Sequence, residues 1–219
     1  MLINHWVCGD YYRDRFGDLR AATVEHVWIT LISVGLGLAV ALPLALLARR
    51  FLPLQSVILG GSTVIYTIPS LAMFSLLLPY THLTATTVIV GLALYSLTIL
   101  VRNILAGLRS VPDEVRDAAT GLGYGPLRRL LRIELPLALP VVIAGLRVAT
   151  VSTVALTTVG AIVGYGGLGN LLLDGVDTQF KAEILAASVL CVALAVLLDL
   201  ALVALQFLIT PWARRGLRS

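Results

Sequence analysis

The chain has 219 residues, of which 58% are hydrophobic and only 13% are charged, with a net charge of +4. A soluble domain needs a more highly charged surface, and no Asp, Glu, Lys or Arg occurs between Phe51 and Val101. The composition therefore excludes a soluble protein and predicts a single-domain, all-α integral membrane protein, because helices satisfy their own backbone groups in lipid. The basic residues are spread over several loops, so we expect no nucleic-acid partner. The lone Cys8 and Cys191 predict neither a disulfide nor a metal site.

The N-terminal residues 1–24 are too rich in charge for a signal peptide. Their aromatic side chains, Trp6, Tyr11, Tyr12 and Phe16, favour an external segment that lies at the membrane interface. A loosely ordered tail is the alternative. The remaining residues 25–212 are predicted to form the transmembrane domain.

Five hydrophobic stretches follow, each near or above the roughly 20 residues that a helix needs to cross a bilayer. They are Val27–Leu47, Leu54–Leu78, Thr84–Val101, Leu137–Val163 and Ile184–Ile209.

Basic residues outside these stretches fall mostly on one side of the predicted membrane. That side has Arg49, Arg50, Arg102, Arg109, Arg116, Arg128, Arg129, Arg132, Arg214, Arg215 and Arg218. The other side has only Arg13, Arg15, Arg20 and Lys181, together with several acids. Because basic loops stay in the cytoplasm, the N-terminus is predicted outside the cell, and residues 213–219 form a cytoplasmic basic tail.

The second stretch contains Pro69, which removes a backbone donor and bends a helix. Broken membrane helices often line translocation paths. We therefore predict that Tyr66, Pro69 and Ser70 belong to such a path, with a packing kink as the alternative.

The fourth stretch ends in a glycine-rich segment that contains Gly164, Gly166, Gly167 and Gly169. It lacks the Gly-Lys-Ser/Thr of a phosphate-binding loop and falls on the outer side, so no nucleotide site is predicted there. A hinge or a re-entrant turn is the expected structure.

The polar loop between the third and fourth stretches has signals for two short helices. Pro112 and the following acids start a helix over Asp113–Thr120, and glycines then reverse the chain. A second helix is predicted over Leu127–Glu134 and ended by Pro136. This knob could dock into a groove of a partner, although an ordinary basic loop would share its composition.

Seven positions of this loop carry a recognisable pattern: Asp117, Ala118, Ala119, Gly123, Ile133, Leu135 and Pro136. The pattern resembles the signature of permease subunits of type I ATP-binding-cassette (ABC) importers with a five-helix, methionine-permease-like core. In that family the loop, here about residues 106–136, couples the permease to its ATPase. Asp117 departs from the usual Glu but keeps the charge. The surroundings of Pro69, Arg147 and Gly166 are similar to permeases for glycine betaine, choline, carnitine or proline betaine.

The resemblance implies a subunit of the inner (cytoplasmic) membrane that is not itself an enzyme. Its implied partners are ABC ATPase subunits, a second permease subunit, with a heterodimer favoured, and an extracytoplasmic substrate-binding protein. No cofactor is expected on this chain, and ATP with Mg²⁺ would bind the ATPase. Glycine betaine, carnitine or choline is the expected cargo, with another small solute, such as an amino acid, as the alternative.

Arg147 and Asp199 are charged residues within the fourth and fifth stretches. Isolated charges are costly in a membrane, so we predict an ion pair or a shared polar network. The alternative is that Arg147 reaches the membrane surface while Asp199 is protonated or faces water. Functions of other classes stay open: an ion-coupled secondary transporter, or a membrane scaffold without transport activity.

Overall fold

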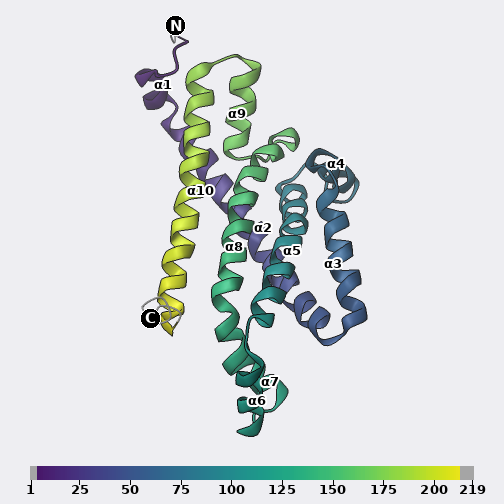
Figure 1. Cartoon of the computed structure of the whole chain (residues 1–219). Coiled ribbons are helices and arrows are strands. Elements are labelled where there is room, and N and C mark those ends of the chain that lie inside the picture. The colour runs from purple at the N-terminus through teal and green to yellow at the C-terminus, as the bar shows by residue number, and fades with distance from the viewer. Residues whose placement is uncertain (1–3, 213–219) are drawn as a thin grey trace.

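The structure is a computed structural model that describes residues 4–212, and these residues form helices and no strands. Figure 1 shows long helices side by side, with a small helical knob at one end. The helices are α1 (Gly9–Asp14), α2 (Phe16–Arg50), α3 (Leu52–Thr67), α4 (Ser70–Thr81), α5 (Ala85–Arg109), α6 (Asp113–Gly121), α7 (Pro126–Arg129), the π-helix η1 (Leu130–Glu134), α8 (Leu135–Thr157), the 3-10 helix η2 (Thr158–Val163), α9 (Leu168–Asp177) and α10 (Lys181–Ile209).

Five membrane spans are present if one broken pair of helices counts as a single span. Four helical stretches in the described part of the chain are long and apolar enough to cross a membrane: α2, α5, Pro126–Val163 and α10. The fifth is the pair α3 and α4, which bends by 99° between Thr67 and Ser70. The predicted all-α membrane fold is confirmed.

Two helices extend beyond the predicted boundaries. The 35-residue α2 begins at Phe16, so the boundary drawn between residues 24 and 25 falls inside one helix. At 1.5 Å per residue it is about 52 Å long, well over the roughly 30 Å hydrocarbon core. Helix α5 continues past the predicted end at Val101 to Arg109. Arg102 does not end the helix. Its guanidinium group donates to the Thr63 hydroxyl of the neighbouring α3 (2.8 Å), so the charge has a polar partner there.

Helix α5 is the centre of the fold, packed against α2, α3 and α8. Its residues Leu100, Val101 and Ile104 are buried against small alanines of α2, including Ala45. Close approach requires glycine at two crossings. A Cβ on Gly37 of α2 would lie 1.9 Å from the Ser96 hydroxyl oxygen, and a Cβ on Gly145 of α8 would lie 2.2 Å from the Asn103 Cβ. Small residues thus bring these helices into contact, as is usual inside membranes.

The N-terminal segment packs against the start of α10. Tyr11 of α1 is buried, with its ring edge-on to Tyr12 and to Phe180 at centroid distances of 5.7 and 5.1 Å. The Asn4 side chain donates to the Gln179 carbonyl and accepts from the Lys181 N–H. The described part of this segment is therefore anchored to the protein. The predicted tail, 213–219, lies outside the described residues.

Candidate functional site

The knob begins with a helix that is fixed to the end of α5. Helix α6 starts after Pro112 with Asp113 and Glu114 in its first turn, where carboxylates suit the positive end of the helix. Arg116 donates to Asp113 (2.5 Å) and to the Leu108 carbonyl of α5 (2.6 Å). These bonds hold the start of α6 against the end of α5.

A glycine turn then reverses the chain, as the sequence predicts. Gly123 has φ of +80°, a conformation that side chains with a Cβ disfavour. Its N–H donates to the Thr120 carbonyl (2.9 Å), and the N–H of Tyr124 donates to the Ala119 carbonyl (3.1 Å). Nothing lies within 4 Å of where a Gly123 Cβ would be. Backbone conformation, and not space, accounts for glycine here.

The second knob helix does not end at Pro136, so this boundary was wrong. Residues Pro126–Val163 run as one helical stretch through α7, η1 and α8. Pro136 is the second residue of α8, which follows directly on η1. The π-helical turn directly before it changes the hydrogen-bond register and accommodates the proline ring. The knob is therefore joined rigidly to a membrane-spanning helix.

The predicted coupling residues divide between the surface and the interior. Asp117 and Ala118 are exposed, whereas Ala119 is buried under α6. Ile133, Leu135 and Pro136 are half-buried where the knob meets the membrane helices. The expected smooth surface formed by both alanines is thus formed by Ala118 alone.

The exposed face of the knob is apolar with a basic border. Leu122, Leu127 and Leu131 are exposed, Leu122 at 77%. The Arg128 guanidinium group lies over the Tyr124 ring, 4.7 Å from its centroid. Exposed leucines on a polar, protruding element are typical of a surface that binds another protein.

Sequence reasoning missed the residue that ties the knob to the first membrane helix. The Glu134 side chain is 1% exposed, accepts from Arg129 Nε (2.9 Å), and forms an ion pair with Arg49 at the end of α2. Arg129 also donates to the Thr120 hydroxyl of α6 (2.9 Å). The only sequence signal was an acid within the apolar run before Pro136.

The break between α3 and α4 is centred on Pro69, as predicted. The Ile65 carbonyl, four residues before the proline, accepts instead from the Ile68 N–H (3.2 Å). The Ile68 carbonyl accepts from the Tyr95 hydroxyl of α5 (2.5 Å). Tyr66 and Pro69 are exposed, and Ser70 is half-buried. The freed backbone is thus held by a tyrosine from another helix.

The glycine-rich segment forms a tightly packed turn between η2 and α9. Gly164 and Gly167 have φ of +82° and +55°. Gly167 also touches α2, because a Cβ added to it would lie 2.6 Å from the His26 Cβ. A Cβ added to Gly169 would lie 2.2 Å from the Thr158 carbonyl oxygen. The Gly166 N–H donates to Asn170. The turn is therefore fitted closely against its neighbours.

Arg147 of α8 and Asp199 of α10 form the predicted ion pair. Arg147 Nε donates to Oδ1 and Nη2 donates to Oδ2, both at 2.7 Å. The two side chains are about one-third exposed on the face of the helix pair. This two-pronged geometry is the strongest that an arginine can make with a carboxylate.

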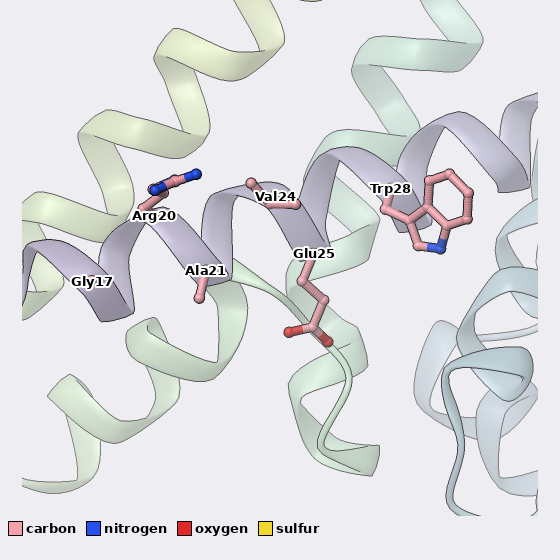
Figure 2. A pocket seen from close by; sticks show the side chains of 6 residues that line it. All are labelled: Gly17, Arg20, Ala21, Val24, Glu25 and Trp28. Carbon is pink, nitrogen blue, oxygen red and sulfur yellow. The ribbon is translucent and has the colours of Figure 1, made fainter.

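A shallow cavity of about 620 Å³ lies along the N-terminal half of α2. Figure 2 shows that all six lining residues, among them Arg20, Glu25 and Trp28, come from this one helix. The cavity is thus an open face and not an enclosed solute site. Among residues 4–212, no cluster of His, Cys, Asp or Glu could hold a metal ion.

The family assignment follows from the spans, the knob and a matching family model. Residues 33–215 match the family described as "Binding-protein-dependent transport system inner membrane component". The chain belongs to this family. It is therefore a multi-pass membrane protein and a transport permease subunit without a catalytic role.

Relatives in this family align over almost the whole chain. The osmoprotectant import permease protein OsmW of Salmonella typhimurium is 35% identical, with 95% of this chain and 98% of the relative covered. The choline transport system permease protein OpuBB of Bacillus subtilis is 32% identical, with 93% and 94% covered. The carnitine transport permease protein OpuCB of Listeria monocytogenes is 29% identical, with 95% and 96% covered.

Solved structures share the fold of this permease. The inward-facing methionine ABC transporter MetNI matches with a TM-score of 0.79 at 20% identity, covering 90% of this chain and 98% of that one. An amino acid ABC transporter matches with a TM-score of 0.71 at 18% identity, covering 94% and 98%. At these identities the likeness shows the fold alone.

Proposed function

We propose that this chain is the permease subunit of an ATP-driven importer for quaternary-ammonium osmoprotectants such as glycine betaine, carnitine or choline. The observation that carries the cargo class is the 29–35% identity, over more than nine-tenths of the chain, to permeases named for osmoprotectants, choline and carnitine. A permease for another small solute, such as an amino acid, is the second candidate, favoured only by the fold shared with amino acid transporters.

The knob is proposed as the contact with a separate ATPase subunit, which would hold ATP and Mg²⁺. Its exposed leucines offer an apolar surface, and Asp117 and Ala118 lie on the outside of α6. The continuous helix Pro126–Val163 and the Glu134 ion pairs would transmit motion of the knob into α8 and α2. Ile133, Leu135 and Pro136 would act at the root of the knob, and Gly123 would set its turn.

The translocation path is proposed along the broken span. Tyr66 and Pro69 are exposed at the break between α3 and α4, where no residue of 4–212 covers them. Irregular backbone at membrane depth is tolerated where it lines a cavity or meets protein. A second permease subunit facing this surface would supply the other wall. We favour a different but related chain for that subunit, since the relatives include two differently named permeases of one glycine betaine/carnitine/choline system.

The proposed orientation rests on the distribution of arginines. The Arg49–Glu134 ion pair shows that the α2–α3 end and the knob lie at the same end of the molecule. Basic residues gather at this end, which supports a cytoplasmic position for it and an N-terminus outside the cell. An external binding protein would then meet the end formed by α1, α4 and α9, which lies opposite the knob in Figure 1.

The test is uptake by the reconstituted importer. The chain is co-expressed with its ATPase and second permease, placed in liposomes, and given the cognate binding protein with radiolabelled glycine betaine, choline, carnitine or an amino acid. We expect ATP-dependent uptake of a quaternary-ammonium compound. Uptake of an amino acid alone would replace the cargo assignment. Uptake that continues without ATP and follows an imposed ion gradient would favour a secondary transporter, and no uptake together with no ATPase binding would favour a scaffold.

A further inference from the structure

A basic cavity lies where α2 ends beside the root of the knob. It has a volume of about 450 Å³ and is lined by Arg49 and Arg50 of α2, Arg129 of α7, and Glu134. Three guanidinium groups and one carboxylate thus line the cavity, which leaves a net charge of about +2 in a small space. The ion pairs with Glu134 leave this excess positive charge uncompensated.

The arginines keep hydrogen-bond donors free to bind a ligand. Within residues 4–212, Arg49 makes its ion pair to Glu134 through Nη2, and Arg129 uses Nε and Nη1. Arg50 forms no ion pair with any described residue, and its guanidinium carbon lies 5.6 Å from the Phe51 ring centroid. The side chains of Arg49 and Arg129 are 27% and 29% exposed, so their free N–H groups can reach the cavity. Guanidinium groups arranged in this way match the oxygens of a phosphate.

The surface next to the cavity identifies the source of that phosphate. Leu46 lines the cavity, and Leu42, one turn further into the membrane, is exposed on the same face of α2. A cationic pocket followed by an apolar stripe has the order of a phospholipid, with the headgroup at the membrane boundary and the acyl chains inside. A soluble anion has no acyl chain that could contact the apolar stripe.

We propose that this cavity binds the phosphate of an anionic phospholipid, with Arg50 as the unpaired contact and Arg49 and Arg129 as contacts shared with Glu134. The bound phosphodiester, with one negative charge, would offset part of the excess positive charge between α2 and the knob. The proposal requires membrane insertion but not the proposed cargo. It therefore stands or falls separately from the osmoprotectant assignment.

The test measures lipid binding to the purified full-length chain in a neutral detergent. Dioleoylphosphatidylglycerol, dioleoylphosphatidylcholine and inorganic phosphate are titrated separately, and the rise in the thermal unfolding midpoint gives an apparent dissociation constant. We expect a saturable rise with phosphatidylglycerol only. Arg50→Gln, which breaks no ion pair, should weaken binding about fivefold, the effect of roughly one basic residue at a membrane surface. Arg109→Gln removes an equal charge from the end of α5, outside the cavity, and should leave the constant unchanged.

A second variant should change the affinity for phosphatidylglycerol in the opposite direction. Glu134→Gln removes the negative charge from the cavity and should tighten phosphatidylglycerol binding about fivefold. Glu134 is buried and supports the knob. If Glu134→Gln does not fold, the test therefore rests on Arg50→Gln. Equal effects of Arg50→Gln and Arg109→Gln would overturn the proposal, as would equal binding of phosphatidylcholine. A full shift with inorganic phosphate alone would assign the cavity to a soluble anion instead.

Discussion

Single residues set the geometry of the knob, and Glu134 and Gly123 do so in different ways. Glu134 is buried between Arg49 and Arg129, and it holds the knob to α2 through charge. Gly123 touches nothing at its Cβ position and acts only through its backbone conformation. The two residues therefore call for different substitutions: removal of charge at Glu134, and addition of a methyl group at Gly123.

Gly123→Ala should weaken the knob, and Gly121→Ala should not. A left-handed alanine costs about 1–2 kcal/mol, whereas alanine at the helical Gly121 is expected to stabilise α6 by about 0.5–1 kcal/mol. Neither added methyl group meets a neighbour within 4 Å. Co-purification with the ATPase and thermal unfolding measure the effect. Equal losses in both variants would show that bulk on the knob surface matters more than the turn.

Arg147→Ala and Asp199→Ala should each lower the thermal unfolding midpoint, and the double variant should lose less than the sum of the two. Each single change leaves the partner's charge without its counter-ion on a partly exposed surface within the predicted spans. The measurement is a double-mutant cycle on the purified chain. Strictly additive losses would mean that the two charges act independently in spite of their contact.

At the scale of elements, proline produces different results at its two key sites. Pro69 breaks the second span into α3 and α4 with a bend of 99°. Pro136 leaves Pro126–Val163 as one helical stretch. The difference lies in what surrounds each proline: a π-helical turn precedes Pro136, whereas the Tyr95 hydroxyl of α5 donates to the Ile68 carbonyl next to Pro69. A proline in the sequence shows where a donor is missing, but its neighbours decide whether the helix bends.

Tyr95→Phe should loosen the break between α3 and α4. It removes the hydroxyl that binds the Ile68 carbonyl and leaves a part-buried acceptor without this partner, at a cost of about 1–3 kcal/mol. Thermal unfolding and uptake by the reconstituted importer report the loss. Tyr80→Phe is the matched control, because Tyr80 is 83% exposed in α4. Equal behaviour of the two variants would mean that the break does not depend on this bond.

At the scale of the whole molecule, the basic end and the knob coincide. Arg49 and Arg50 at the end of α2 lie beside Arg129 of the knob, although the chain crosses the bundle several times between them. The turn between α9 and α10 lies at the opposite end (Figure 1). The arrangement of the bundle thus agrees with the tally of arginines made from the sequence, and it gives the two ends opposite expected sides of the membrane.

Single cysteines should report this orientation. In a background with Cys8→Ser and Cys191→Ala, Thr178→Cys in the α9–α10 turn should react with a membrane-impermeant maleimide in intact cells. Leu122→Cys on the knob should react only in inside-out vesicles. Both positions are exposed, so access and not burial controls the labelling. The reverse pattern would place the knob outside the cell and remove the basis for an ATPase contact.

Local features of the sequence were sufficient for much of this protein. Hydropathy and the exclusion of charge predicted the membrane class and the five spans, because the cost of burying a charge or an unpaired backbone group in lipid acts on each segment separately. The turn at Gly123, the start of α6 and the break at Pro69 were predicted for the same reason, since the required backbone geometry depends on a few adjacent residues.

The tertiary structure decided what depends on the rotation and depth of one helix against another. Arg147 meets Asp199 across 52 residues, Tyr95 reaches the Ile68 carbonyl, and Glu134 lies between arginines from two elements. The sequence suggested the first of these contacts only because both charges were out of place in lipid. The sequence held no signal for the basic cavity beside α2, because hydropathy describes each span alone. Contacts between spans depend on how the small residues of α2, α5 and α8 let the helices pack.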